Sequence, residues 1–318
     1  MKIKVQGVSM IELIIALGLG LYLTSITISL TLNSFKSARQ IELTGQVFES
    51  GRYLLGLLNR ELDLAGFYGQ ISYMAEGTEA MVDLCAGLTA GNLAQHLAFP
   101  IQGLNNAAAN TSACGGDRLL PGSDLLLIRR VADEAIPPSS GLLQSQHYIQ
   151  ASPSHLIADT GAHPAHFSLA QADAISAVPV RAFQPTLYYV SEDGNFKRRR
   201  FLKGRWSPAE PLVESVDDFQ LLYGIDRSGK GIANALETAP AFVDYPSSDD
   251  EWRRVVAVEF YLLLSSGDAA PGASGTKTYS YAGKHEVRFK DNKKRRLFKG
   301  LSGLVNIRRR PKELPHAL

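Results

Sequence analysis

The sequence predicts an α+β protein in which one long N-terminal helix packs on an antiparallel β-sheet domain. Two observations carry this prediction. No proline occurs between Met1 and Gly69, and apolar residues recur in that stretch at helical spacing. Beyond residue 121 the apolar segments are short, rich in Val, Tyr and Phe, and separated by turn residues, which is typical of strands joined in hairpin order.

The size and composition of the chain limit the class of protein to which it can belong. The chain has 318 residues, of which 45% are hydrophobic and 20% charged, with a formal net charge of +2. These values fit one large or two small globular domains and exclude a disordered chain. The charge is unevenly distributed, because residues 284–313 contain twelve Lys or Arg and only three acidic residues.

The first part of the expected helix is long and apolar enough to cross a membrane. Residues 10–32 contain a single charge, Glu12, and 23 residues suffice for a hydrocarbon core of about 30 Å. A cleaved secretory signal is disfavoured, because the apolar run is too long and no small-residue cleavage site follows it. A plain anchor leaves Glu12 unexplained, since a charge within a bilayer costs roughly 3 kcal/mol or more.

The stretch "KVQGVSMIEL" resembles the processing signal of type IV pilins and pseudopilins. The resemblance implies that prepilin peptidase cuts between Gly7 and Val8, that Val8 is then N-methylated, and that Glu12 becomes the fifth residue. Val8 stands where the family usually has Phe. An unpaired charge among packed apolar helices costs several kcal/mol, so we expect Glu12 to pair with the new amine of its own or a neighbouring subunit. Two lysines precede Gly7, which places the leader in the cytoplasm.

The second part of the expected helix carries an apolar stripe that predicts packing on a domain. The stripe consists of Val47, Gly51, Leu54, Leu58, Leu62 and Ala65. A helix from Val8 to Ala65 would be about 87 Å long, and residues 66–69 form its stop. A coiled-coil dimer is the alternative, but the stripe is short and interrupted by glycine. The stretch "GRYLLGLLNRELDLAGFYG" resembles the corresponding segment of PilW-type minor pilins.

The two cysteines lie in the first part of the globular domain. Residues 70–121 are rich in Ala, Gly, Asn and Ser and are expected to form a long loop with short elements. If this domain lies outside the cytoplasm, Cys85 and Cys114 are expected to form a disulfide, worth about 3–4 kcal/mol by loop-closure entropy. Two free thiols are the alternative, and a metal site is disfavoured because no Cys-x-x-Cys spacing occurs.

The remaining domain is expected to consist mainly of strands. We predict them over residues 124–132, 185–201 with a turn at Asp193–Gly194, 211–226, 253–266, 285–290 and 303–310. Residues 133–179 are polar and contain histidine, and they are expected to form a loop. The stretch "LVESVDDFQLLYGID" and the basic stretch leading to "LVNIRRR" also resemble PilW-type sequences.

No pattern predicts catalysis or a cofactor. The sequence lacks the metalloprotease helix, the serine nucleophile elbow and the P-loop. "DRSGKG" is expected to be a turn and no calcium site, because Arg227 and Lys230 occupy ligand positions. "HPAH" (residues 163–166) is interpreted as a loop, with an adventitious metal pair as the alternative. The basic stretch 284–312 is interpreted as a charged strand edge, and a surface for a protein partner is the alternative. Nucleic acid is disfavoured as a partner, because only Phe289 and Phe298 could stack on bases.

The resemblance implies a non-enzymatic minor pilin of the inner membrane. Its partners would be prepilin peptidase, the other minor pilins, the major pilin and a tip adhesin, and it would prime pilus assembly at the tip for adhesion and twitching motility. The expected segments are the leader 1–7, a membrane or filament-core half 8–32, an amphipathic half 33–66 and a periplasmic domain 67–318. The alternatives are a tip pseudopilin of a type II secretion system and a membrane-tethered periplasmic binding domain or enzyme. The largest kind of pseudopilin typically lacks the acid at position five, so Glu12 argues against it.

Overall fold

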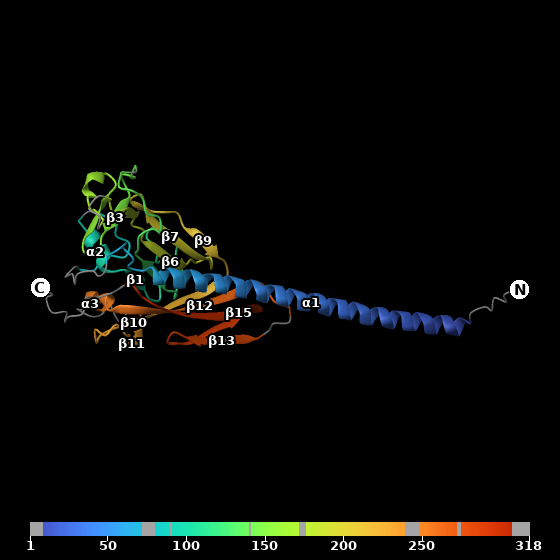
Figure 1. Ribbon diagram of the computed structural model, residues 1–318. Coiled ribbons are helices and arrows are strands. Elements are labelled where there is room, and N and C mark those ends of the chain that lie inside the picture. The colour runs from blue at the N-terminus through green and yellow to red at the C-terminus, as the bar shows by residue number, and fades with distance from the viewer. Residues whose placement is uncertain are drawn as a thin grey trace.

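A single long helix runs into a domain built of antiparallel sheets (Figure 1). The computed structural model describes residues 9–71, 80–89, 91–139, 141–171, 176–238, 248–271 and 275–306. Within them, helix α1 (Met10–Asp63) is continuous, as the absence of proline predicts. It ends two residues earlier than expected, and Gly66 follows in the left-handed conformation (φ 73°) that favours glycine. The other helices are short: α2 (Leu93–Ala98), the 3₁₀ turn η1 (Pro164–His166) and α3 (Ser248–Arg253).

The first large sheet has the strand order β1-β2-β6-β7-β8, with β9 paired to β7. All of these pairings are antiparallel. The strands are β1 (Ile101–Leu104), β2 (Leu125–Ile128), β6 (Thr186–Val190), β7 (Phe196–Leu202), β8 (Arg205–Trp206) and β9 (Glu210–Val213). The expected hairpin is confirmed: β6 and β7 are joined at Asp193–Gly194, where Gly194 has a φ of 76°.

The second large sheet has the order β11-β10-β12-β15. Two smaller sheets, β13-β14 and β4-β3-β5, complete the domain, again with antiparallel pairs. The strands are β3 (His147–Ala151), β4 (Leu156–Thr160), β5 (Val180–Ala182), β10 (Val216–Ile225), β11 (Ala235–Glu237), β12 (Val255–Ala269), β13 (Thr276–Tyr281), β14 (Lys284–Lys290) and β15 (Lys293–Gly303). The predicted α+β class is therefore confirmed.

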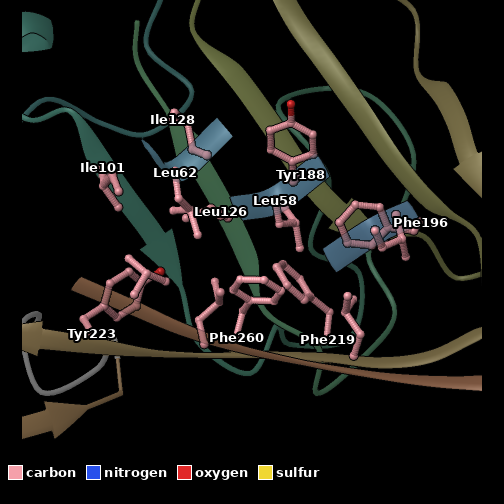
Figure 2. Close-up of a cluster of buried hydrophobic side chains, with 14 of the residues drawn as sticks. Leu58, Leu62, Ile101, Leu126, Ile128, Tyr188, Phe196, Phe219, Tyr223 and Phe260 are labelled. Atoms are coloured by element: carbon pink, nitrogen blue, oxygen red, sulfur yellow. The ribbon is translucent and has the colours of Figure 1, made fainter. Parts of the chain in front are cut away.

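The main core lies where the second half of α1 passes between the two large sheets. Figure 2 shows Leu58 and Leu62 between Tyr188 of one sheet and Phe219 and Phe260 of the other. The whole expected stripe is buried: Val47, Gly51, Leu54, Leu58, Leu62 and Ala65. Burying a valine or leucine side chain contributes roughly 1.5–3 kcal/mol, so this half of α1 is an integral part of the domain.

Three expectations about the strands were wrong. Residues 133–179 contain β3 and β4 in addition to loops. The sequence of β3 does not show the apolar pattern of a buried strand, because several of its buried residues are polar. Gln150 is one of them, and its side-chain amide donates to the carbonyl of Val178 at 2.6 Å. The expected strand 211–226 is two strands in different sheets, β9 and β10, and it breaks next to Ser215, which has a φ of 60°.

The third wrong expectation concerns the strand that closes the second large sheet. That strand is the basic β15 and not the stretch 303–310. Only residues 303–306 of that stretch are described, and residues 307–310 lie outside the described residues.

Candidate functional site: the helix α1 and its junction with the domain

The first half of α1 is fully exposed although it is apolar. Every residue from Ser9 to Ala38 in the described chain is exposed, including Met10, Leu21 and Phe35. Among the described helices, α1 alone is long and apolar enough to cross a membrane. Such a surface is unfavourable in water. Its length and hydropathy fit membrane anchoring or burial among similar helices.

Four hydroxyl groups of this half form hydrogen bonds within the helix itself. The hydroxyls of Thr24, Thr27, Ser29 and Thr31 each donate to the backbone carbonyl four residues earlier, at 2.7–3.0 Å. Hydroxyls bonded in this way need no water. The segment can therefore enter an apolar environment without leaving these groups unpaired.

Glu12 is the single acidic residue of this half, and its side chain turns back towards the start of the chain. Its carboxylate accepts a hydrogen bond from the backbone N–H of Ser9 at 2.9 Å, and the Ser9 hydroxyl accepts from the N–H of Ile11 at 3.4 Å. The two residues form a capping box at the N-terminus of α1. Sequence reasoning missed this role of Ser9, although the Ser-x-x-Glu spacing was visible. Gly7 and Val8 lie outside the described residues.

The junction with the domain begins at Arg39. Its guanidinium contacts Glu42 at 2.8 Å and Asp268 at 2.5 Å, and the side-chain amide of Gln40 donates to the carbonyl of Pro271 at 2.5 Å. Side chains from Leu43 onward are then buried on one face of the helix. The change from an exposed to a docked helix thus occurs within about one turn.

A buried ion pair fixes the C-terminal end of α1 to the end of β2. The guanidinium of Arg130 binds both carboxylate oxygens of Glu61, at 2.9 and 3.0 Å, and only 8% of the Glu61 side chain is exposed. Burial lowers the pKa of Arg130, but the hydrogen bonds with Glu61 outweigh this and raise it overall. The two groups line a groove of about 320 Å³ together with Arg60, Arg198 and Arg200. Acidic side chains pair with these arginines: Glu61, Asp133 and Glu210.

A second buried arginine holds the first large sheet to α2. Arg129 is fully buried and donates to the carbonyl of Phe99 at 2.6 Å, to Nδ1 of His96 at 3.2 Å and to the side-chain oxygen of Gln102. Burial lowers the pKa of Arg129 to about 10. Burial and the neighbouring Arg129 lower the pKa of His96 to about 3, which leaves its ring neutral as an acceptor. Arg129 therefore joins the end of β2 to α2 and β1, and we assign it a structural role.

The expected disulfide is present. Cys85 and Cys114 are bonded with an S–S distance of 2.08 Å and a sequence separation of 29. The bridge ties the loop after α1 to the turn before β2, next to the buried Leu119 and Leu125. A stable disulfide fits an oxidising compartment.

Within the described residues of the basic stretch, Arg295 and Lys299 pair with acidic side chains of the domain. Strand β15 lies at the end of the second large sheet and also contacts α1. Arg295 is bound by Asp217 and Asp291, and Lys299 pairs with Glu259 at 2.8 Å. In the "DRSGKG" turn, the Asp226 carboxylate accepts from the N–H groups of Ser228 and Gly231, as the interpretation as a turn predicts.

In this architecture the first half of α1 is apolar and exposed, and its second half is part of the core of an antiparallel domain. Comparison with known proteins gives it a family context. The family of type IV pilus-assembly protein W (PilW) matches residues 184–306, from β6 to beyond β15. This confirms the resemblance noted in "LVESVDDFQLLYGID" and in the basic closing stretch.

The other comparisons add little. A type IV-like pilin from Thermus thermophilus has a TM-score of 0.38 and 12% identity, covering 83% of this chain and 98% of that one. No curated protein matches the chain. The PilW match and the observed architecture support a role in type IV pilus assembly.

Proposed function

We propose that the chain is a minor pilin of a type IV pilus. Prepilin peptidase would cut between Gly7 and Val8, and the mature chain would join other minor pilins in a complex that primes pilus assembly at the tip. The observation that supports this most strongly is the contrast between the two halves of α1. One half is apolar and exposed from Ser9 to Ala38, and the other is fixed in the core of the domain.

The exposed half suits both stages of such a function. In the inner membrane it would span the bilayer, with the leader in the cytoplasm and the domain in the periplasm. In the filament the same surface would pack against the helices of neighbouring pilins. Because the second half of α1 is held by the core and by Glu61–Arg130, a force on the helix would be transmitted to the domain.

Glu12 is proposed as the residue that sets the axial register of the subunit. Its capping bond to Ser9 holds the carboxylate beside the start of the helix, where cleavage would create a positively charged amine. A carboxylate within apolar surroundings costs roughly 3 kcal/mol or more, so subunits that pair it with an amine are favoured over misaligned ones. The family match to pilus assembly favours this function over the type II secretion alternative.

Mass spectrometry of the membrane-extracted chain tests the processing step. We expect a mature N-terminus at N-methylated Val8. Retention of Met1 in cells with active prepilin peptidase would contradict the proposal and would favour a membrane-tethered periplasmic domain.

A matched pair of substitutions tests Glu12 itself. Glu12→Gln removes the charge and keeps the shape, and we expect fewer pili and reduced twitching motility. Glu49→Gln makes the same change on the exposed face of the docked half, and we expect pilus numbers near those of the unaltered strain. Normal piliation of the Glu12→Gln strain would remove the proposed register role. Loss of secretion with normal pili in a deletion strain would favour the pseudopilin alternative.

A further inference from the structure

The "HPAH" stretch is part of a three-residue cluster in the sheet β4-β3-β5. His163 and His166 meet Asp159, which lies at the end of the edge strand β4. The Nδ1 atom of His163 lies 3.3 Å from one carboxylate oxygen, and the Nδ1 atom of His166 lies 2.5 Å from the other. Single potential ligand atoms of the three side chains all lie within 4.8 Å of one another.

The local backbone explains why the two rings converge. Residues three apart in a 3₁₀ turn lie on the same side of it, and Pro164 at the first position of η1 suits such a turn. The backbone N–H of His166 donates to the carbonyl of His163 at 3.0 Å. The two imidazole rings are stacked, with centroids 5.0 Å apart and an angle of 24° between their planes.

Both ends of the loop that carries the histidines are fixed to the domain. At the start, the N–H of Gly161 donates to the carbonyl of Gln146, and a Cβ at Gly161 would lie 2.3 Å from the carbonyl oxygen of Leu143. At the end, Phe167 is buried and packs edge-on against Tyr148, with centroids 6.4 Å apart. The cluster is therefore held in place by its surroundings, which favours a binding site over a chance contact.

We propose that Asp159, His163 and His166 form an open three-ligand site for a divalent transition metal of the zinc class. Imidazole nitrogen with carboxylate oxygen is a donor set that suits Zn²⁺, whereas Ca²⁺ and Mg²⁺ take oxygen ligands. Ligand atoms around a tetrahedral zinc ion lie roughly 3.3 Å apart, which is the separation between Asp159 and His163. The 2.5 Å contact between Asp159 and His166 is shorter than this separation, so these two side chains would move apart to admit the ion.

The charges and the accessibility of the cluster fit this site. Asp159 supplies a carboxylate whose two oxygens each lie beside one of the histidine rings. The backbone N–H of Thr160 donates to the same carboxylate at 2.6 Å and orients it. The side chains of His163 and His166 are 57% and 62% exposed, which leaves an approach for the ion and a fourth position for water or another ligand.

Zinc titration of the untagged full chain in detergent, after treatment with EDTA, tests the proposal. A chelating dye as competitor gives the affinity, and mass spectrometry of the metal content gives the stoichiometry. We expect one Zn²⁺ per chain and a rise of the thermal unfolding midpoint on addition of zinc. In His163→Ala and His166→Ala the affinity should fall by at least about tenfold, and the thermal shift should be lost.

His155→Ala is the matched control. His155 is also exposed, contacts Ser154 and precedes the opposite end of β4, and its removal should leave the zinc affinity unchanged. Cobalt binding to the unaltered chain gives a readout without any variant, because tetrahedral Co²⁺ has intense ligand-field absorption bands that the octahedral aqua ion lacks. The proposal is overturned if the unaltered chain takes up no zinc, or if His155→Ala weakens binding as much as His163→Ala.

Discussion

Gly51 of α1 lies directly against the ring of Phe298 on β15. A Cβ at residue 51 would be 2.2 Å from the nearest ring atom, and the ring is confined on another side by the edge of Phe48, at a centroid distance of 6.0 Å. The close approach of helix and strand therefore depends on the missing side chain. Glycine in a helix interior costs about 1 kcal/mol relative to alanine, so the packing at this point offsets a local disadvantage.

Gly51→Ala is expected to destabilise the domain. The added methyl group must displace Phe298 or separate α1 from β15, and overpacking of this kind costs about 1–3 kcal/mol. The urea midpoint of the full chain in detergent, followed by near-ultraviolet circular dichroism, measures the loss. Gly56→Ala is the control, because nothing lies within 4 Å of a Cβ there, and it should stabilise by up to about 1 kcal/mol. A stabilised Gly51→Ala chain would show that the contact is not restrictive.

Removing one charge of the ion pair between Glu61 and Arg130 is expected to destabilise the domain strongly. Replacing both residues by apolar side chains is expected to destabilise it less. Glu61→Gln leaves a buried guanidinium without its main carboxylate, and the free energy of unfolding should fall by about 3 kcal/mol or more. The double variant Glu61→Leu with Arg130→Met removes both charges and should lose less than either charge-removing single variant. Urea unfolding of the unaltered chain, Glu61→Leu, Arg130→Met and the double variant forms the cycle. Additive losses would mean that the two side chains do not depend on each other.

The sequence predicted the features that depend on local periodicity. The buried stripe of α1 follows from spacing alone, since Val47, Leu54 and Leu62 recur at helical intervals. The hairpin at Asp193–Gly194 follows from turn chemistry. The apolar character of the first half and its single acid, Glu12, follow from composition.

Features that depend on tertiary contacts were missed. Strand β3 contains His147 and Gln150, polar residues whose burial is possible only in the folded domain, so the segment has no strand pattern. Because β3 and β4 were not predicted, Asp159 could not be placed beside "HPAH". No sequence pattern indicates the break at Ser215, because β9 and β10 have similar residue types although they belong to different sheets.

The disulfide is expected to stabilise the domain by restricting its unfolded state. Joining residues 29 apart in sequence contributes about 3–4 kcal/mol in the loop-closure model. Replacing both Cys85 and Cys114 by serine should lower the thermal unfolding midpoint by several degrees. A reductant should lower the midpoint of the unaltered chain to a similar value and leave the double variant unchanged. A reductant effect on the double variant would point to another cause.

Asp291 is expected to give the domain an acid-sensitive contribution to stability. Its two oxygens accept from the guanidinium of Arg295 at 2.6 and 2.7 Å, and that side chain is only 3% exposed, stacked on the ring of Phe289. The hydrogen bonds from Arg295 are the largest influence on the carboxyl group and outweigh burial, so the pKa of Asp291 falls to about 2. A lowered pKa in the folded state means that the stabilisation is complete above the unfolded pKa of about 4 and is lost as the pH falls towards 2.

Asp291→Asn should therefore be less stable than the unaltered chain between pH 5 and 7, and the difference should shrink between about pH 4 and pH 2. Urea unfolding at each pH measures it. Glu134→Gln, an exposed change elsewhere on the domain, should differ little at any pH. In an Arg295→Met background the Asp291→Asn change should have almost no effect, because the partner that lowers the pKa of Asp291 is gone. A difference between the unaltered chain and Asp291→Asn that persists undiminished at pH 2 would mean that Asp291 stabilises by shape and not by charge.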